Sequence, residues 1–208
     1  MGTNMELKMR QLCVFLPAIM LATAAQAAET PPDAKALIQP EIVEAVAEWL
    51  SNPIVALSIN AQNNLRGSLS QADIDALDAQ WRQEREAADK PLISATLSAP
   101  LSIYLLRVQA GSLGLYPEIF VMDANGLNVG QSAITSDYWQ GDEAKFQKTF
   151  PNGPETVFID EPEWDDGSKI WRAQLNMTIT DPETKKAIGA ATVEFNLTEL
   201  MRRQGTGS

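Results

Sequence analysis

The chain has 208 residues, 45% of them hydrophobic, and a formal net charge of −11, which disfavours binding to phosphate backbones and anionic lipid surfaces. It contains no histidine and one cysteine, so His-containing catalytic triads and His-ligated zinc are excluded. It also lacks a glycine-rich phosphate-binding motif. We therefore expect no enzymatic activity, no cofactor, no resident metal and no nucleic-acid partner.

The first 27 residues have the three parts of a secretory signal peptide. Lys8 and Arg10 precede an apolar run at residues 12–21, and Ala25-Gln26-Ala27 ends the segment. The run is shorter than the roughly 20 residues of a membrane span, although an uncleaved membrane anchor is the alternative interpretation. We expect cleavage after residue 27, a periplasmic mature protein and no disulfide, because cleavage removes Cys13.

The mature chain begins with a polar lead-in, residues 28–39, that we expect to be flexible. Apolar residues at helical spacing follow from Pro40 to Leu65, and Asn52-Pro53 marks a break or a restart. Ser70 is a predicted N-cap for the next helix. Residues 94–107 are mostly apolar and predict a buried helix, which an internal proline kinks or divides.

The pattern changes to strands after Gly114. Asn125-Gly126 predicts a hairpin turn, and residues 142–150 predict a short helix between strands. Five strands are expected, at residues 118–123, 127–132, 155–160, 169–179 and 187–196. We expect one domain over residues 40–203, with a helical half at 40–113 and a sheet half at 115–203, which is an α+β layout.

A series of short motifs in this second half carries a family resemblance. They are, in chain order, Phe120-Val121-Met122-Asp123-Ala124-Asn125-Gly126, Asp137-Tyr138-Trp139-Gln140 with Glu143 and Phe146, Val157-Phe158-Ile159-Asp160-Glu161-Pro162, Asp181-Pro182-Glu183-Thr184 with Ala187-Ile188-Gly189, and Phe195-Asn196-Leu197-Thr198-Glu199-Leu200. The series resembles Cache domains, the PAS-like extracytoplasmic sensor modules of bacterial receptors. This resemblance implies an antiparallel sheet of about five strands with a long N-terminal helical region packed along it.

Two positions depart from the family pattern. Ile179-Thr180 stands where many members carry Pro-Ile near the end of a middle strand. Asp142 or Glu143 stands where a basic residue is usual in the aromatic helix, and this disfavours a simple carboxylate ligand. Most members lie between membrane helices of kinases or chemoreceptors, whereas we expect this chain to be a free-standing periplasmic form.

The segment from Ser136 to Glu143 is the first candidate for a binding site. Its mixture of aromatic and polar side chains suits the wall of a small polar pocket. The resemblance implies that Asp137, Tyr138, Trp139 and Gln140 line such a pocket, together with Glu143. The alternative is a surface loop with one aromatic residue anchored in the core.

Four further residues are candidates. Asp160 ends a strand beside the acidic run 161–166, which offers carboxylates for an amine or a calcium ion, although a solvated acidic loop is the simpler interpretation. Trp171 either closes one side of a cavity or belongs to the core. Tyr104 and Arg107 are one helical turn apart. Arg107 is the best candidate to bind a ligand anion, and a surface salt bridge is its commoner role.

Two functions from different classes are compatible with these features. The first is a periplasmic sensor that binds a small polar molecule (an amine, an amino acid or a small organic acid) and signals through a membrane partner. The second is an exported interaction or dimerisation module of the same fold, working through its N-terminal helix as a homodimer. Unexplained apolar residues on the outer side of Pro40 to Leu65 would favour the second.

Overall fold

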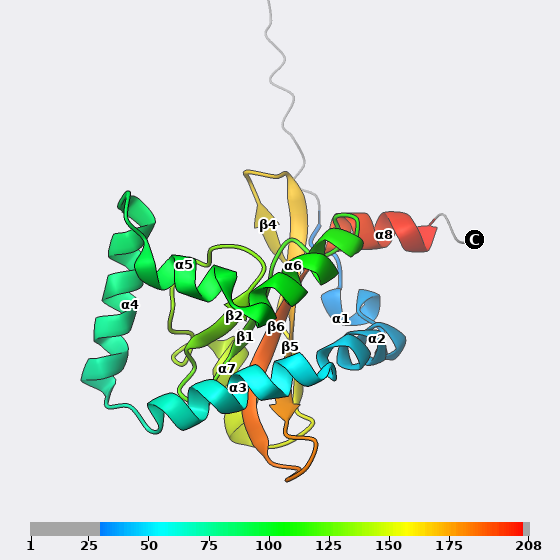
Figure 1. The fold of residues 1–208 in the computed structure, drawn as a ribbon. Helices are drawn as coiled ribbons and strands as arrows, with labels where there is room; N and C mark the ends of the chain where they lie inside the picture. Colours follow the sequence, from blue (N-terminus) through cyan, green and yellow to red (C-terminus); the bar gives the residue numbers. More distant parts are fainter. Residues whose placement is uncertain (1–29, 206–208) are drawn as a thin grey trace, which may run out of the picture. The chain divides into compact units, whose positions relative to one another are not determined.

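The computed structural model describes residues 30–205, so the expected signal peptide lies outside the described residues. Six antiparallel strands make one sheet (Figure 1). They are β1 (Ile119–Met122), β2 (Asn128–Gln131), β3 (Val157–Ile159), β4 (Glu163–Asp165), β5 (Ile170–Thr180) and β6 (Ala187–Asn196). Their order is β2-β1-β6-β5-β3, and β4 also pairs with β5. The expected α+β class and the five predicted strands are confirmed.

The strand β4 was not expected, because its residues lie in the segment interpreted as an acidic loop. It forms because Trp164 pairs with Trp171 across the two strands, with ring centroids 5.5 Å apart. Asp165 in the same strand makes a 2.8 Å ion pair with Arg172. Cross-strand aromatic and charged pairs of this kind stabilise antiparallel sheets by roughly 0.2–1 kcal/mol each.

The helices before the sheet are α1 (Ala34–Leu37), α2 (Pro40–Leu50), α3 (Pro53–Arg66), α4 (Gln71–Glu86), α5 (Pro91–Ser98) and α6 (Pro100–Gly111). Four of them begin with proline, which suits the first helical position because its missing N–H has no partner there anyway. Ser70 caps α4 as predicted, accepting a 3.3 Å hydrogen bond from the N–H of Asp73. The later helices are α7 (Ala144–Gln147), η1 (Phe150–Asn152) and α8 (Leu197–Gly205).

The helical region is broken rather than continuous. The chain bends by 65° between α2 and α3 and by 67° between α5 and α6. Asn52 caps α3 at the first bend, where its side chain accepts a hydrogen bond from the N–H of Ile54. Within residues 30–205 no single helix has the length and hydropathy of a membrane span, and only these two bent pairs meet that standard jointly.

The segment expected to be a flexible lead-in is partly structured. Asp33 caps α1 by accepting hydrogen bonds from two backbone N–H groups, at 3.0 and 3.1 Å. Ala34 and Ile38 are buried in the main core. The segment therefore belongs to the folded unit, which extends from Pro31 onward.

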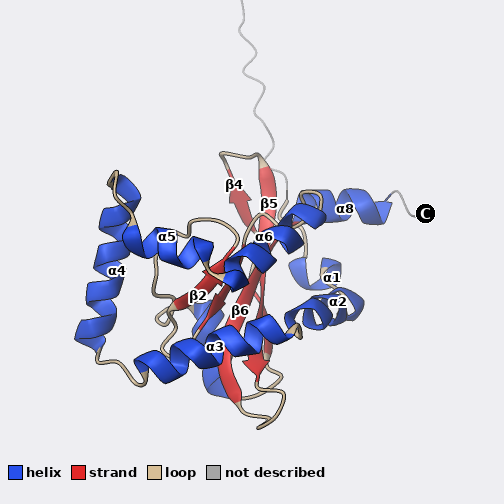
Figure 2. Ribbon diagram, in the orientation of Figure 1, coloured by secondary structure: helices blue, strands red, loops and turns tan. Residues whose placement is uncertain are grey.

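The main core lies between the sheet and the helices in front of it in Figure 2. Alternate strand residues such as Val121, Leu175 and Val193 face the helices and pack against Ile59 and Leu101. The opposite face of the sheet is apolar only where α7 and η1 cover it. There Phe120, Met122 and Ala190 pack with Phe146 and Phe150.

Side-chain amides of α3 hold two hairpin turns. Asn60 donates a 2.7 Å hydrogen bond to Asp181 in the β5–β6 turn. Gln62 donates a 2.8 Å bond to Asp123 in the β1–β2 turn. Asn63 contacts both hairpins, since it donates to the carbonyl of Ile188 and accepts from the backbone N–H beside Asp123. One helix thus fastens two turns that lie at the same end of the sheet, where Met122 at the end of β1 pairs with Ala190 near the start of β6.

Candidate functional site

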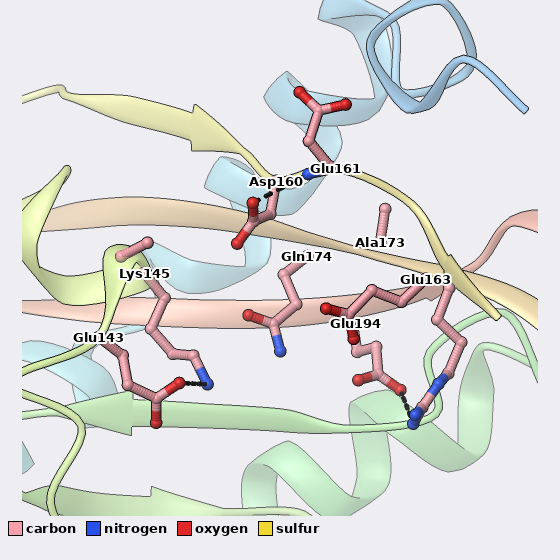
Figure 3. A pocket seen from close by; sticks show the side chains of 10 residues that line it. Glu143, Lys145, Asp160, Glu161, Glu163, Ala173, Gln174 and Glu194 are labelled. Atoms are coloured by element: carbon pink, nitrogen blue, oxygen red, sulfur yellow. Dashed lines mark hydrogen bonds and ion pairs between the residues drawn. The ribbon is translucent and has the colours of Figure 1, made fainter. Parts of the chain in front are cut away.

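A polar hollow of about 230 Å³ lies on the sheet face that points away from the main helical layer (Figure 3). It is smaller than the 300–1,000 Å³ typical of sites for drug-sized ligands, so it suits a small metabolite. The lining residues come from the α7 region, the β3–β4 connection, and the strands β4, β5 and β6. They are Glu143, Ala144, Lys145, Asp160, Glu161, Glu163, Arg172, Ala173, Gln174 and Glu194.

Strand register brings the polar residues together. Arg172 and Gln174 are two apart on β5 and therefore point to the same face. Glu194 lies opposite Gln174 on β6, and Glu163 lies opposite Arg172 on β4. The backbone N–H of Asp160 donates to the carbonyl of Gln174 at 2.9 Å, which holds the end of β3 beside the same strand.

Two ion pairs lie on either side of Gln174 in the view of Figure 3. At one end, the Lys145 ammonium lies 3.0 Å from a Glu143 carboxylate oxygen. At the other end, the Arg172 guanidinium binds Glu194 at 2.8 Å, and it also binds Asp165 at 2.8 Å. The side chain of Gln174 makes no hydrogen bond with any residue from 30 to 205, which leaves its amide available to a ligand.

The electrostatics of the hollow are dominated by carboxylates. Five carboxylates and two cations line it, so its formal charge is −3 when all are ionised. Burial raises the pKa of Glu194, while the neighbouring Arg172 opposes that shift. Glu118 lies beside Glu194 at the start of β1, and burial, followed by the charge of Glu194, raises its pKa to about 7. An added positive charge would be favoured here.

Of the nine residues predicted for the site, Glu143 and Asp160 line the hollow. Tyr138 lies elsewhere, in a second packed core between α4, α5 and the loop after β2. Its side chain is 1% exposed, its ring stacks on Trp81 at 5.1 Å, and its hydroxyl accepts a 2.8 Å hydrogen bond from Arg66. Tyr138 therefore anchors its loop in a core, as the alternative interpretation proposed for one aromatic residue.

The other residues of that loop are also occupied. Asp137 forms a 2.9 Å ion pair with Arg82, and the indole N–H of Trp139 donates to the carbonyl of Asn125. Gln140 is 2% exposed, and its side-chain amide oxygen accepts a 3.2 Å hydrogen bond from Lys145. In this loop Glu143 lines the hollow directly, whereas the side chain of Gln140 is connected to it through the hydrogen bond with Lys145, which lines the hollow.

The remaining three candidates lie away from the hollow. Trp171 packs against the main core and against Trp164. The Tyr104 hydroxyl donates to the carbonyl of Trp49 at 2.7 Å, beside a separate open hollow between α2, α3 and α6. Arg107 is exposed on α6 and makes no ion pair within residues 30–205.

Sequence reasoning missed Lys145, Arg172, Gln174 and Glu194, whereas Glu163 lies in the acidic run 161–166 that it named as a source of carboxylates. A signal for two of them was present, because Arg172 and Gln174 alternate with the apolar Ala173 and Leu175. A charged Glu194 within the apolar final strand was a second signal. Among the described residues, no group of three or more His, Cys, Asp and Glu side chains has the arrangement of a metal site.

Comparison with known proteins gives structural similarities only. No protein-family model and no curated protein sequence matches the chain. Among solved structures, the ligand-binding domain of the amino acid chemoreceptor PctC from Pseudomonas aeruginosa PAO1, in complex with GABA, is similar with 14% identity and a TM-score of 0.35. The ligand-binding domain of the Campylobacter jejuni chemoreceptor Tlp3 in complex with 4-methylisoleucine is similar with 12% identity and a TM-score of 0.39. The DcuS sensor domain of E. coli is similar with 19% identity and a TM-score of 0.39.

The extent of these matches differs between the structures. The matches to PctC and Tlp3 cover 78% and 82% of this chain, but the chain spans only 62% and 66% of those domains. The match to DcuS covers 65% of this chain and 99% of that domain. All three of those structures are sensor or ligand-binding domains.

Proposed function

We propose that this protein is a periplasmic sensor domain that binds a small polar molecule in the hollow on the open face of its sheet. The observation that carries the proposal is the hollow itself, with the unbonded amide of Gln174 between two ion pairs. Concave sites with a few convergent polar groups are the usual form of small-molecule sites. An amine, an amino acid and a small organic acid are the candidate ligands.

The proposed role is recognition without chemical conversion. The hollow contains carboxylates, an amide, an ammonium and a guanidinium, and both cations already pair with carboxylates. No histidine or cysteine lines it to serve as an ordinary proton-transfer group or nucleophile. In the proposed role, binding shifts the protein between two conformations, and a membrane partner recognises the shifted one.

A thermal-shift screen tests the binding site. The purified protein is heated with amines, amino acids, organic acids and calcium, and a ligand that binds the folded state raises the melting temperature. The variant Gln174→Ala should lose most of that increase. The matched control is Gln83→Ala, which removes an exposed glutamine from α4 and should keep the increase. No response to the panel, or an equal response in both variants, would refute the proposal.

The alternative function, an interaction module, is supported by a different observation. Leu57 and Leu65 on the outer side of α3 are 66% and 84% exposed, and Ile103 and Leu106 on the adjoining α6 are also exposed. For this alternative we propose a second copy of the chain as the partner. Two copies that each have a net charge of −11 repel one another least if they meet through an apolar face. A contact with twofold symmetry pairs such a face with itself.

Light scattering after gel filtration tests this alternative. The wild-type protein should elute as a dimer, and the double variant Leu57→Asp, Leu65→Asp should be a monomer with an unchanged circular-dichroism spectrum. Leu113→Asp changes a leucine that is 80% exposed beyond the end of α6, and this variant should remain dimeric. A monomeric wild-type protein at high concentration would exclude the dimer.

A further inference from the structure

Both cations of the hollow already pair with carboxylates, while the buried Nε of Arg172 has no hydrogen-bond partner among residues 30–205. The Lys145 ammonium lies 3.0 Å from the Glu143 carboxylate, donates to the side-chain amide oxygen of Gln140, and lies 5.3 Å from the centre of the Phe120 ring. Arg172 bridges two carboxylates, one at each terminal nitrogen. A ligand carboxylate would have to displace one of these partners and leave a carboxylate unpaired in a partly buried site.

Two carboxylates of the hollow, in contrast, have no cationic partner. Glu163 makes no hydrogen bond or ion pair through its side chain within residues 30–205. Asp160 accepts a single hydrogen bond, from the backbone N–H of Glu161. In Figure 3 the Asp160 carboxylate points toward the space around Gln174, whereas Glu161 points away from it. The hollow can therefore neutralise added cations without losing an existing pair.

The spacing of these carboxylates favours two positive groups rather than one. Asp160 is held beside Gln174, and Glu163 is paired with Arg172, which lies two residues before Gln174 on β5. Two residues of a strand span about 7 Å. A linear diamine with four carbons places its nitrogens five bonds apart, roughly 6 Å in a zigzag chain of about 1.5 Å bonds.

The groups beneath the hollow add to this preference. Glu194 and Glu118 face each other on neighbouring strands. Burial is the first cause of the raised pKa of each carboxyl, and the charge of Glu194 adds a negative potential at Glu118 that Lys145 and Arg172 oppose. A dication entering from the open side would relieve that potential. A zwitterion would add no net charge, and a dicarboxylate would increase the repulsion.

We propose that the hollow takes a small linear diamine, with one ammonium near Asp160 and Gln174 and the other near Glu163, and that it rejects ligands that carry a carboxylate. This inference rests on the proposed function, because it names the ligand class of the same site. The amide oxygen of Gln174 accepts a hydrogen bond from the first ammonium, which has three N–H donors.

Titration calorimetry with three four-carbon compounds tests the inference. The compounds are 1,4-diaminobutane, 4-aminobutanoate and succinate, which differ only in their end groups. We expect measurable binding of the diamine alone. Loss of one charge-assisted hydrogen bond corresponds to roughly a 10- to 100-fold loss of affinity, so Asp160→Asn and Glu163→Gln should each weaken diamine binding by that factor.

The control for diffuse attraction is Glu183→Gln, which removes an exposed carboxylate in the β5–β6 turn and should leave the affinity unchanged. An equal loss in this control would overturn the inference. If 4-aminobutanoate or succinate binds and Gln174→Ala abolishes that binding, the diamine inference is overturned and the proposed function stands. Absence of binding by all three compounds, together with no response in the thermal-shift screen, would overturn both. Melting temperatures of the free variants verify that each is folded.

Discussion

Replacement of Glu118 by glutamine should change how the stability of the protein depends on pH. Glu118 is largely buried at the start of β1, and the backbone N–H of Glu194 donates to its carbonyl at 2.8 Å. Burial first, and then the Glu194 carboxylate, raises its pKa from 4.5 to about 7, against the opposing charges of Lys145 and Arg172. Folding therefore strengthens proton binding at this carboxyl.

The sign and size of the effect follow from that shift. Between pH 4.5 and pH 7 the folded state holds the proton more tightly than the unfolded state, so the stability that Glu118 contributes is full below pH 4.5 and falls until about pH 7. A difference of about 2.5 pKa units corresponds to roughly 3 kcal/mol. Glutamine has a similar shape and no charge, so Glu118→Gln should not lose this part of the stability as the pH rises.

Urea unfolding followed by tryptophan fluorescence at pH 5, 6, 7 and 8 measures the difference. The free energy of unfolding of Glu118→Gln, relative to wild type, should rise by about 2–3 kcal/mol from pH 5 to pH 8. Glu86→Gln, which removes an exposed carboxyl at the end of α4, should follow the wild-type profile. A constant difference between wild type and Glu118→Gln across this range would refute the reasoning.

Three further outcomes are expected. Gly189→Ala should lower the free energy of unfolding by at least about 2 kcal/mol in the same urea assay, because the added Cβ would lie 2.1 Å from the Met122 carbonyl oxygen. The control Gly111→Ala adds a Cβ that meets nothing within 4 Å, so it should be neutral or slightly stabilising. Tyr138→Phe should cost about 1–3 kcal/mol, measured in the same way, because the guanidinium of Arg66 then loses its buried hydroxyl acceptor. Diamine binding at pH 7 should release protons, because a bound cation lowers the pKa of Glu118, and Glu118→Gln should reduce the release measured by calorimetry in buffers of different ionisation enthalpy.

Local signals were sufficient to predict most of the fold. Ser70 as an N-cap, the break at Asn52-Pro53 and the turn at Asn125-Gly126 each act within a few residues, so the sequence alone predicts them. The strand β4 was missed because its pairing depends on Trp171 and Arg172 in a neighbouring strand. In that segment a cross-strand contact outweighed the local excess of acidic residues.

The site was less predictable because its residues meet only through strand register. Tyr138 is suited by composition to line either a hollow or a core, and its partner Trp81 lies 57 residues earlier in the chain. Arg172, Gln174 and Glu194 come together because β5 and β6 pair in one register, which no single segment reveals. Glu143 and Asp160, which line the hollow, were named as candidates because each directly adjoins a recognisable element.

The amide hydrogen bonds of α3 connect the β1–β2 and β5–β6 hairpins, the second of which lines the hollow, to the helical layer on the other side of the sheet. Asn60, Gln62 and Asn63 attach the turns of two hairpins to one rigid rod, and the strands of those hairpins include β6, which supplies Glu194 to the hollow. A displacement of these strands would therefore either move α3 with them or break these hydrogen bonds. Because α3 follows α2 directly across the 65° bend at Asn52, a displacement of α3 would also change the angle or the position of α2 near the N-terminal end of the domain.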